Sequence, residues 1–280
     1  MDTNELRAWI GRRETHEDVI TAGALARMAA LLDREPVEWR AGTPVPELWH
    51  WAYCLPSQRQ SGLGADGHPA RGGFLPPAWL PRRMWAGSKL EFLRPLAAGA
   101  AIERRSTITD VTHKEGRTGA LIFVTVQHEV RDAQGVAIQE RQDIVYRDAP
   151  RPGDSGSTAA PGEEPQWSRT VEPDSTLLFR YSALTFNSHR IHYDRPYAQG
   201  EEGYAGLVVH GPLIATLLVD LVHREIPGAR LKSFEFRGVR PTLDTAPFQV
   251  CGRMAEDGAI SLWARDAEGR LATKASARLA

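Results

Sequence analysis

The sequence lacks the features of a secreted, membrane-spanning or nucleic-acid-binding protein. Its two cysteines, Cys54 and Cys251, lie far apart without CxxC spacing, so we interpret them as reduced structural thiols. The 34 basic and 35 acidic residues nearly cancel, which gives no electrostatic reason to bind nucleic acid or an anionic membrane. The charged N-terminal residues lack an apolar signal core, and no apolar run is long enough to span a bilayer. We therefore expect a cytoplasmic protein that is not exported.

Residues 179–225 organise the rest of the chain, because a polar run rich in histidine precedes an apolar helix there. His210-Gly211-Pro212 marks the start of this helix, since proline is favoured at the first helical position. From Leu213 to Val222 nearly every residue is apolar. A helix that is apolar on all faces must be enclosed, and this one is too short for a bilayer. Other parts of the chain are therefore expected to wrap it.

Two series of β-rich runs flank this stretch, within residues 89–146 and 231–277. Lys89-Leu90-Glu91-Phe92, followed by Arg94-Pro95, resembles Ser233-Phe234-Glu235-Phe236, followed by Arg240-Pro241. The turn sequence at 131–135 recurs at 265–269 in the same order, which indicates a duplicated unit. We predict an α+β double hot-dog fold, with two antiparallel sheets side by side, each wrapped around a helix. The predicted division is an N-terminal domain at 1–147, a Pro/Gly-rich linker at 148–166 and a C-terminal domain at 167–280.

The N-terminal part is expected to open with two helices. Thr15 and Asp18 have the spacing of a capping box, and apolar residues recur at helical spacing from Val19 to Leu32. We interpret that helix as the counterpart of the apolar helix in the other half. Residues 44–81 are crowded with Gly, Pro and Trp, which predicts a long ordered loop of the kind that forms lids or binding walls.

The polar run is a candidate site for acid–base chemistry on a carbonyl compound. Imidazole is the side chain most easily poised as acid or base near neutral pH, which points to His189 and His192. The backbone N–H groups around Gly211 lie at a helix N-terminus and could stabilise an enolate-like thioester oxygen. A metal site of His189, His192 and Asp194 is a rival interpretation, although this spacing without an HExxH helix is weak evidence for one.

The whole pattern resembles a known family. FNSHRIHYDRPYA and GYAGLVVHGPLIATLL are similar to the hydratase motif of the MaoC-like, (R)-specific enoyl-thioester hydratases and dehydratases, which have hot-dog folds. GGFLPP and RRMWAGSKLEF resemble the FAS1-like dehydratase domain that precedes MaoC domains, as in double hot-dog hydratases. The resemblance implies water addition to an acyl-CoA or acyl-carrier-protein thioester, without a cofactor or metal. We also expect a homodimer, although no residue pattern in the sequence indicates one.

The family motif Asp-x-Asn-Pro-x-His-x-Asp carries the catalytic histidine onto His192 and the catalytic aspartate onto Asn187. An amide cannot take a proton from water as a carboxylate can. The resemblance therefore implies that His192 handles the proton, Asn187 orients the water and His189 assists. Gly211 and His210 would hold the thioester oxygen, with Asp194 and Tyr193 in support.

Three functions remain open at this point: a hydratase, a hot-dog thioesterase, and an acyl-thioester-binding subunit without activity. Arginines near the site could accept a second substrate carboxylate, as a mesaconyl group would need. Arg82, Arg83 and Arg94 are candidates for contacts with cofactor phosphates, and the plainer interpretation is that they are solvated strand ends.

Overall fold

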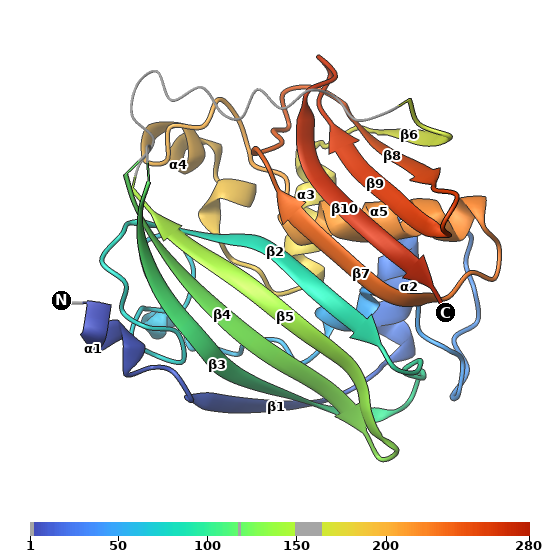
Figure 1. Cartoon of the computed structure of the whole chain (residues 1–280), viewed down its shortest axis with the longest axis horizontal. Coiled ribbons are helices and arrows are strands. Elements are labelled where there is room, and N and C mark those ends of the chain that lie inside the picture. The colour runs from blue at the N-terminus through green and yellow to red at the C-terminus, as the bar shows by residue number, and fades with distance from the viewer. Residues whose placement is uncertain (1–2, 117–118, 149–163) are drawn as a thin grey trace.

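The computed structural model describes residues 3–116, 119–148 and 164–280. Their strands form one antiparallel sheet of ten strands, in the order β1-β3-β4-β5-β2-β7-β10-β9-β8-β6 (Figure 1). The strands are β1 (Arg13–Val19), β2 (Arg82–Phe92), β3 (Ala101–Gly116), β4 (Gly119–Asp132), β5 (Gly135–Arg147), β6 (Trp167–Val171), β7 (Leu231–Gly238), β8 (Phe248–Met254), β9 (Ala259–Arg265) and β10 (Leu271–Leu279). The helices are α1 (Thr3–Arg7), α2 (Ala22–Leu31), α3 (Ser175–Leu184), α4 (Arg195–Gly200) and α5 (Gly211–Glu225), with short 3-10 turns η1 (Trp49–Ala52), η2 (Gln60–Gly62) and η3 (Arg190–His192). The α+β double hot-dog class is confirmed.

The duplication predicted from the sequence is visible at the centre of the sheet. Strands β2 and β7 pair there, and Leu90 faces Phe234, the residue that the repeat aligns with it. The two recurring turn sequences close the β4–β5 and β9–β10 hairpins. In each half the arginine after the central strand forms an ion pair with the aspartate of that turn, Arg94 with Asp132 and Arg240 with Asp266. The two halves are therefore related by a pseudo-twofold axis near the Leu90–Phe234 pair.

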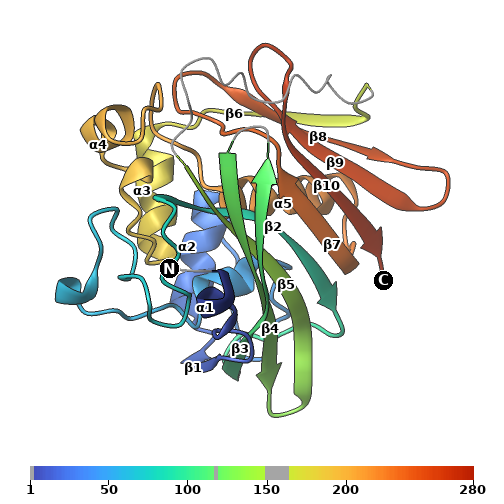
Figure 2. The same cartoon turned by 60° about the vertical axis from the view of Figure 1, so that its left-hand side comes forward.

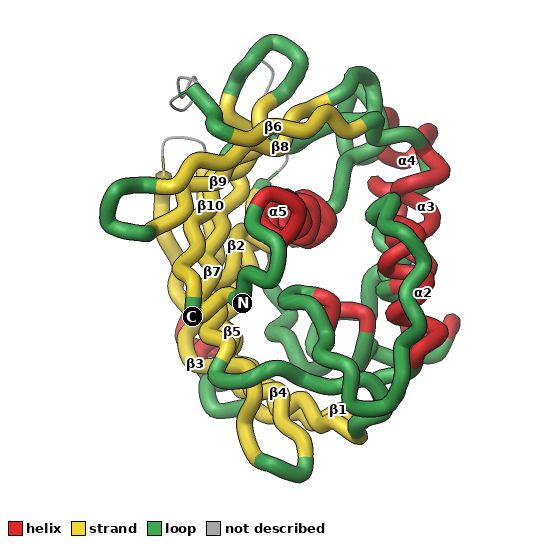
Figure 3. Tube along the Cα trace, turned by 90° about the vertical axis from the view of Figure 1, so that its right-hand side faces the viewer, coloured by secondary structure: helices red, strands yellow, loops and turns green. Residues whose placement is uncertain are grey.

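The apolar helix is enclosed, as expected. Every residue of α5 from Leu213 to Val222 is buried, and the helix contacts β6, β8, β9, β10 and β2. Figure 3 shows α5 against the concave side of the sheet, with α2, α3 and α4 forming a layer beyond it. Burial of such a helix is the main source of its stability, because each large apolar side chain removed from water contributes about 1.5–3 kcal/mol.

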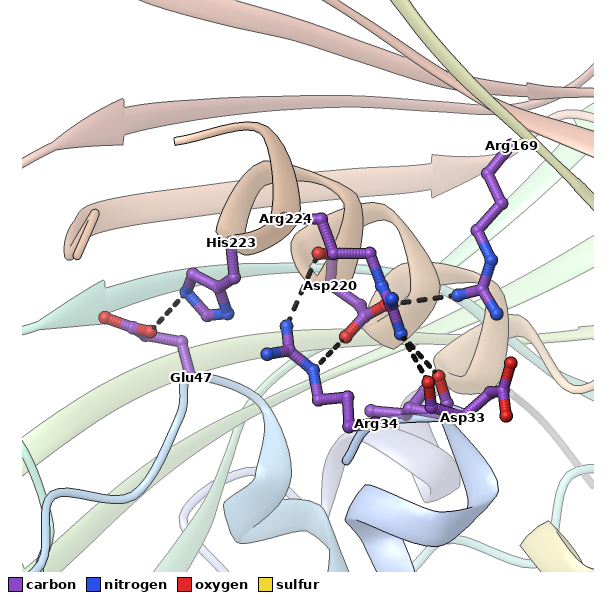
Figure 4. Close-up of polar contacts among 8 residues, drawn as sticks. Asp33, Arg34, Glu47, Arg169, Asp220, His223 and Arg224 are labelled. Carbon is purple, nitrogen blue, oxygen red and sulfur yellow. Dashed lines mark hydrogen bonds and ion pairs between the residues drawn. The ribbon is translucent and has the colours of Figure 1, made fainter. Parts of the chain in front are cut away.

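One charged residue lies on this helix away from water. The Asp220 side chain is only 1% exposed and pairs with three arginines. These are Arg34 after α2, Arg169 on β6, at 3.2 Å, and Arg224 one helical turn further along α5, at 2.7 Å (Figure 4). Arg224 also donates to the backbone carbonyl of Leu32, 2.7 Å away. The cluster thus ties α5 to both the end of α2 and the edge strand β6.

Two expectations for the N-terminal part are wrong. Thr15 and Asp18 lie in strand β1, where exposed and half-buried residues alternate, and not in a capping box. The Asp18 carboxylate instead accepts from the N–H of Cys54 at 2.8 Å, and Thr21 caps α2. Helix α2 follows the edge strand β1 as α3 follows the edge strand β6, and the two helices pack together (Figure 2). Its counterpart is therefore α3 and not α5.

The long loop, the linker and the two cysteines can also be compared with what the sequence predicted. In the described part of the chain, residues 44–81 form an ordered loop with only the short turns η1 and η2, as predicted. Most of the expected linker, residues 149–163, lies outside the described residues. Cys54 and Cys251 are free and buried, and burial raises the pKa of the Cys54 thiol to about 11. No helix of the described residues is long and apolar enough to cross a membrane.

Candidate active site

His192 lies directly beside the N-terminus of α5. Its ring stacks on that of His210, the N-cap residue of α5, with 3.6 Å between ring centroids. The Nδ1 of His192 is 2.7 Å from the carbonyl oxygen of Val208. A carbonyl only accepts, so Nδ1 carries the hydrogen and Nε2 keeps its lone pair. Burial lowers the pKa of His192 to about 4, so the ring is a neutral base at physiological pH.

Gly211 opens the helix with an N–H that has no intrahelical partner. The first helical hydrogen bond at this end runs from Ile214 to the carbonyl of His210, 3.1 Å away. Gly211 is half-buried although its neighbours His210 and Leu213 are fully buried. A Cβ at Gly211 would meet only the carbonyl oxygen of Trp85, at 4.0 Å, so space remains for a ligand atom. This end of α5 can therefore approach the oxygen of a bound carbonyl.

His210 itself is fixed by the helix before the histidine run. Its Nε2 lies 2.8 Å from the hydroxyl of Ser182 on α3, and its Nδ1 has no partner among the described residues. Burial is the main cause of the lowered pKa of His210. Phe186, which follows α3, has a positive φ of 49°. The residues after it bring the ring of His192 against that of His210 at the start of α5.

His189 and Asn187 occupy this returning turn. The Asn187 side-chain oxygen accepts from the backbone N–H of His189 at 3.0 Å, so one amide oxygen lone pair already holds the turn together. The His189 ring is 7% exposed and lies edge-on to His192, with 5.4 Å between centroids. Burial lowers the pKa of His189 far below its ordinary value, and the nearby rings of His68 and His192 and the guanidinium of Arg83 lower it further.

Two further polar residues come from the N-terminal half, and sequence reasoning missed them. Asp66 and His68 lie on the long loop, and the His68 ring is 4.1 Å from that of His189. Asp66 accepts from the His68 backbone N–H at 3.0 Å and pairs with His68 Nδ1 at 3.1 Å. The Asp-Gly-His triplet was available as a signal. Only the tertiary contact between the two halves reveals that it belongs to this site.

The loop is held in place by contacts to the histidine turn. The Arg190 backbone N–H donates to the carbonyl of Asp66 at 2.9 Å, and its side chain donates to the carbonyl of Ala65 at 3.0 Å. The Ser188 hydroxyl donates to the carbonyl of Gly67. Gly67 has a φ of +86°, and a Cβ there would overlap the Ser188 carbonyl. Glycine is therefore required for this close approach.

Asp194 and Tyr193 lie at the edge of the site and stabilise its backbone. Asp194 caps α4 by accepting from the N–H of Tyr197 at 3.1 Å, and it forms an ion pair with Arg190 at 2.8 Å. The Tyr193 hydroxyl donates to the carbonyl of Ser188 at 3.0 Å, and its ring is exposed. Both residues therefore position the histidine turn and do not reach into the site.

The three arginines considered from the sequence have different surroundings. Arg82 is buried and pairs with Glu202 at 3.1 Å, and Arg94 pairs with Asp132. Arg83 is half-buried on β2, two residues before Trp85, whose carbonyl faces Gly211. Its positive charge contributes to lowering the pKa of Asp66, His68 and His189. Arg83 is thus the one of the three that lies at the site.

Asp66, His68 and His189 have side-chain donor atoms within 4.8 Å of one another, a spacing that a metal ion would also require. The pairing of Asp66 with His68 already engages one atom of each, and the nearby guanidinium of Arg83 opposes a further cation. We therefore interpret the cluster as a hydrogen-bonded acid–base group. The rival metal set from the sequence is not assembled, since Asp194 is committed to Arg190 and to α4.

Comparison with known proteins shows the family to which this chain belongs. The family model for hydroxyacyl-thioester dehydratase type 2 matches residues 48–244. The chain is 46% identical to mesaconyl-C(4)-CoA hydratase of Chloroflexus aurantiacus over 283 aligned positions, covering 100% of this chain and 99% of that protein. It is 27% identical to the mitochondrial hydroxyacyl-thioester dehydratase type 2 of Schizosaccharomyces pombe, covering 77% and 78% of the two chains.

A solved structure supports the same class at the level of the fold. The MaoC-like dehydratase of Phytophthora capsici superposes with a TM-score of 0.69 at 13% identity, covering 100% of this chain and 98% of that one. The ten-stranded antiparallel sheet around α5 is thus the hot-dog fold of MaoC-like dehydratases. The chain belongs to the hydroxyacyl-thioester dehydratase type 2 family.

Proposed function

We propose that this protein is a hydro-lyase that adds water reversibly to the double bond of a 2-enoyl-CoA thioester. The observation that carries the proposal is the pairing of two features. A neutral imidazole with a free Nε2, that of His192, stacks on His210, the residue that precedes Gly211 at the start of α5. Water addition next to a thioester needs both a proton acceptor and a group that stabilises the developing oxyanion.

In the hydration direction the thioester oxygen accepts from the Gly211 N–H. A water molecule attacks C3, and its oxygen forms a bond there while one O–H bond breaks toward Nε2 of His192. The π electrons of the C2=C3 bond move to the thioester oxygen as an enolate. That enolate then collapses, and C2 takes the proton from the His192 imidazolium. One water has been added, and His192 is again neutral.

Arg83 supports a substrate with a second carboxylate, such as the mesaconyl group named in the C. aurantiacus relative. When a mesaconyl group is joined to CoA through its C4 carboxyl, its free carboxylate is on the carbon that receives the hydroxyl. A carboxylate at that position would lie near the attacking water and therefore near the histidines. Arg83 is the half-buried cation beside them, and guanidinium binds carboxylates in a bidentate manner.

The proposed partner is an acyl-CoA, with an acyl-carrier-protein thioester as the alternative carrier. A cytoplasmic location, action as a homodimer and the absence of a cofactor remain predictions. A thioesterase would use the same oxyanion contact but would cleave the bond to sulfur. The match to the hydroxyacyl-thioester dehydratase type 2 family and the similarity to a hydratase over the whole chain favour hydration over that alternative.

The test is an assay of short, branched and dicarboxylic enoyl-CoA thioesters, followed by loss of the conjugated absorbance, with a thiol reagent in a parallel reaction. Hydration consumes the conjugated double bond without releasing free CoA. His192→Ala is expected to lower kcat by about 10²–10⁴-fold, the usual contribution of a general acid–base group. Release of free thiol, or unchanged hydration by the His192 variant, would overturn the proposal.

A further inference from the structure

The site needs a hydrogen-bond acceptor for the water molecule in addition to His192. Water has two hydrogens, and one of them passes to His192 in the proposed reaction. Orientation of the attacking oxygen requires that the other hydrogen be held as well. Asn187 was expected to do this; one lone pair of its side-chain oxygen accepts from the N–H of His189, so at most one lone pair is left for the water. Asp194, the nearest carboxylate in sequence, already forms an ion pair with Arg190 and accepts the capping hydrogen bond of α4.

The N-terminal loop supplies a suitable acceptor. An ionised carboxylate only accepts hydrogen bonds, so the Asp66 oxygen at 3.1 Å places the hydrogen of His68 on Nδ1. Nε2 of His68 is then left as an acceptor. The His68 ring centroid is 4.1 Å from that of His189, and the His189 centroid is 5.4 Å from that of His192. The His68 side chain is 23% exposed, so the ring is not sealed within the core.

We propose that His68 is a catalytic residue that holds the second hydrogen of the attacking water, and that Asp66 is its positioning residue. This inference rests on the proposed hydratase function. No proton is transferred to His68: the hydrogen it holds remains on the oxygen and becomes the hydrogen of the new hydroxyl group at C3. In dehydration the same contact holds the departing hydroxyl while it leaves as water. The N-terminal half thus contributes to the chemistry of the C-terminal half.

Substitutions at His68 separate this role from that of a base. His68→Ala removes the acceptor and is expected to lower kcat by about 10²-fold, with KM for the enoyl-CoA changed much less. His68→Gln keeps an acceptor oxygen and is expected to recover a measurable part of that loss. A base cannot be replaced by an amide, so equal loss in the two variants would overturn the acceptor role. Asp66→Ala is expected to lower kcat, because the His68 tautomer is no longer fixed.

A matched pair elsewhere in the chain provides the control. His16 and Glu14 on β1 are also a histidine and an acid two residues apart, 3.6 Å from each other, with side chains 26% and 31% exposed. His16→Gln and Glu14→Gln are expected to leave kcat and KM unchanged. A loss equal to that of the His68 variants would show a general effect of such substitutions and would contradict the inference.

A second variant moves the loop without altering either side chain. Gly67→Ala places a methyl group against the Ser188 carbonyl in a backbone conformation that alanine disfavours. It is expected to lower kcat and to lower the thermal midpoint by a few degrees, while circular dichroism remains that of the folded protein. Full activity in Gly67→Ala and His68→Ala, in a protein that hydrates enoyl-CoA, would refute the inference alone. No hydration of any enoyl-CoA by the unaltered protein would instead refute the proposed function.

A metal at the same residues is a distinct outcome. The unaltered enzyme would be assayed after prolonged treatment with EDTA, and its metal content measured by elemental analysis. Activity unchanged by EDTA supports a hydrogen-bonded Asp66–His68 pair. Loss of activity with EDTA, recovered by one added divalent ion at a stoichiometry near one, would overturn it in favour of a metal site.

Discussion

Removing the charge of Asp220 should destabilise the protein far more than removing any one of its arginines. The carboxylate is buried, whereas the side chains of Arg34, Arg169 and Arg224 are 28%, 31% and 33% exposed. Breaking a buried ion pair on one side typically costs about 3–5 kcal/mol, because a charge is left without compensation. Water reaches about a third of each arginine here, so we expect the lower end of that range, about 3 kcal/mol, for Asp220→Asn.

The asymmetry follows from the number of partners. Without Asp220, three cations face one another around the last turns of α5, and their repulsion adds to the lost attraction. Without Arg169, two cations still compensate the carboxylate, so Arg169→Ala is expected to cost less than about 1 kcal/mol. In the Asp220→Asn background, Arg169→Ala should even stabilise the fold, because it relieves repulsion.

The assay is urea unfolding of the two single variants and the double variant, with thermal unfolding in parallel. A loss of about 3 kcal/mol corresponds to a fall of about 6–12 °C in the midpoint for a domain of roughly this size. The coupling energy of the double-mutant cycle gives the sign of the interaction directly. A thermal midpoint of Asp220→Asn within about 1 °C of the unaltered protein would refute the reasoning. So would a double variant less stable than the sum of the single losses.

Two further predictions concern pH and substrate charge. Burial lowers the pKa of five histidines, His68, His128, His189, His192 and His210, so the unfolded chain binds protons that the folded chain does not. The free energy of unfolding should therefore fall as the pH drops below about 6.5, by up to about 1.4 kcal/mol per pH unit for each histidine. A urea midpoint higher at pH 5 than at pH 7 would contradict this. Arg83→Gln should raise KM for a dicarboxylic enoyl-CoA by about 10-fold or more, because a charged hydrogen bond contributes about 1.5–3 kcal/mol. The same substitution should leave KM for an uncharged enoyl group nearly unchanged. Equal effects on both substrates, measured beside the exposed control Arg141→Gln, would show that Arg83 does not contact the carboxylate.

Local sequence patterns predicted the C-terminal half closely, because its elements carry strong local signals. Strands β7 to β10 extend from Leu231 to Leu279, close to the predicted series at 231–277, and the apolar α5 starts at Gly211 next to the helix-favouring Pro212. The duplication was also predictable, since two short motifs recur in the same order. The pairing of Leu90 with Phe234 follows the alignment of those motifs.

Local patterns failed where a residue's role depends on a partner far along the chain. Thr15 and Asp18 have capping-box spacing, but pairing with β3 makes their segment an edge strand, and the Asp18 carboxylate holds the N–H of Cys54. The Asp66-Gly67-His68 triplet is visible in the sequence, but its proximity to His189 depends on how a long loop crosses from one half to the other. His192 and Gly211 were predictable because both lie in one short stretch of sequence.

The crossing of that loop has a consequence for any division of this chain. Residues 187–211 carry the histidine turn and the start of α5, so the sequence of the C-terminal half contains all the residues that were predicted to form the active site. Its Ser188 and Arg190 nevertheless hold the loop of the other half through the carbonyls of Gly67, Asp66 and Ala65. If gene fission produced two polypeptides, neither would catalyse alone, and activity would return only when they reassembled as a heterodimer.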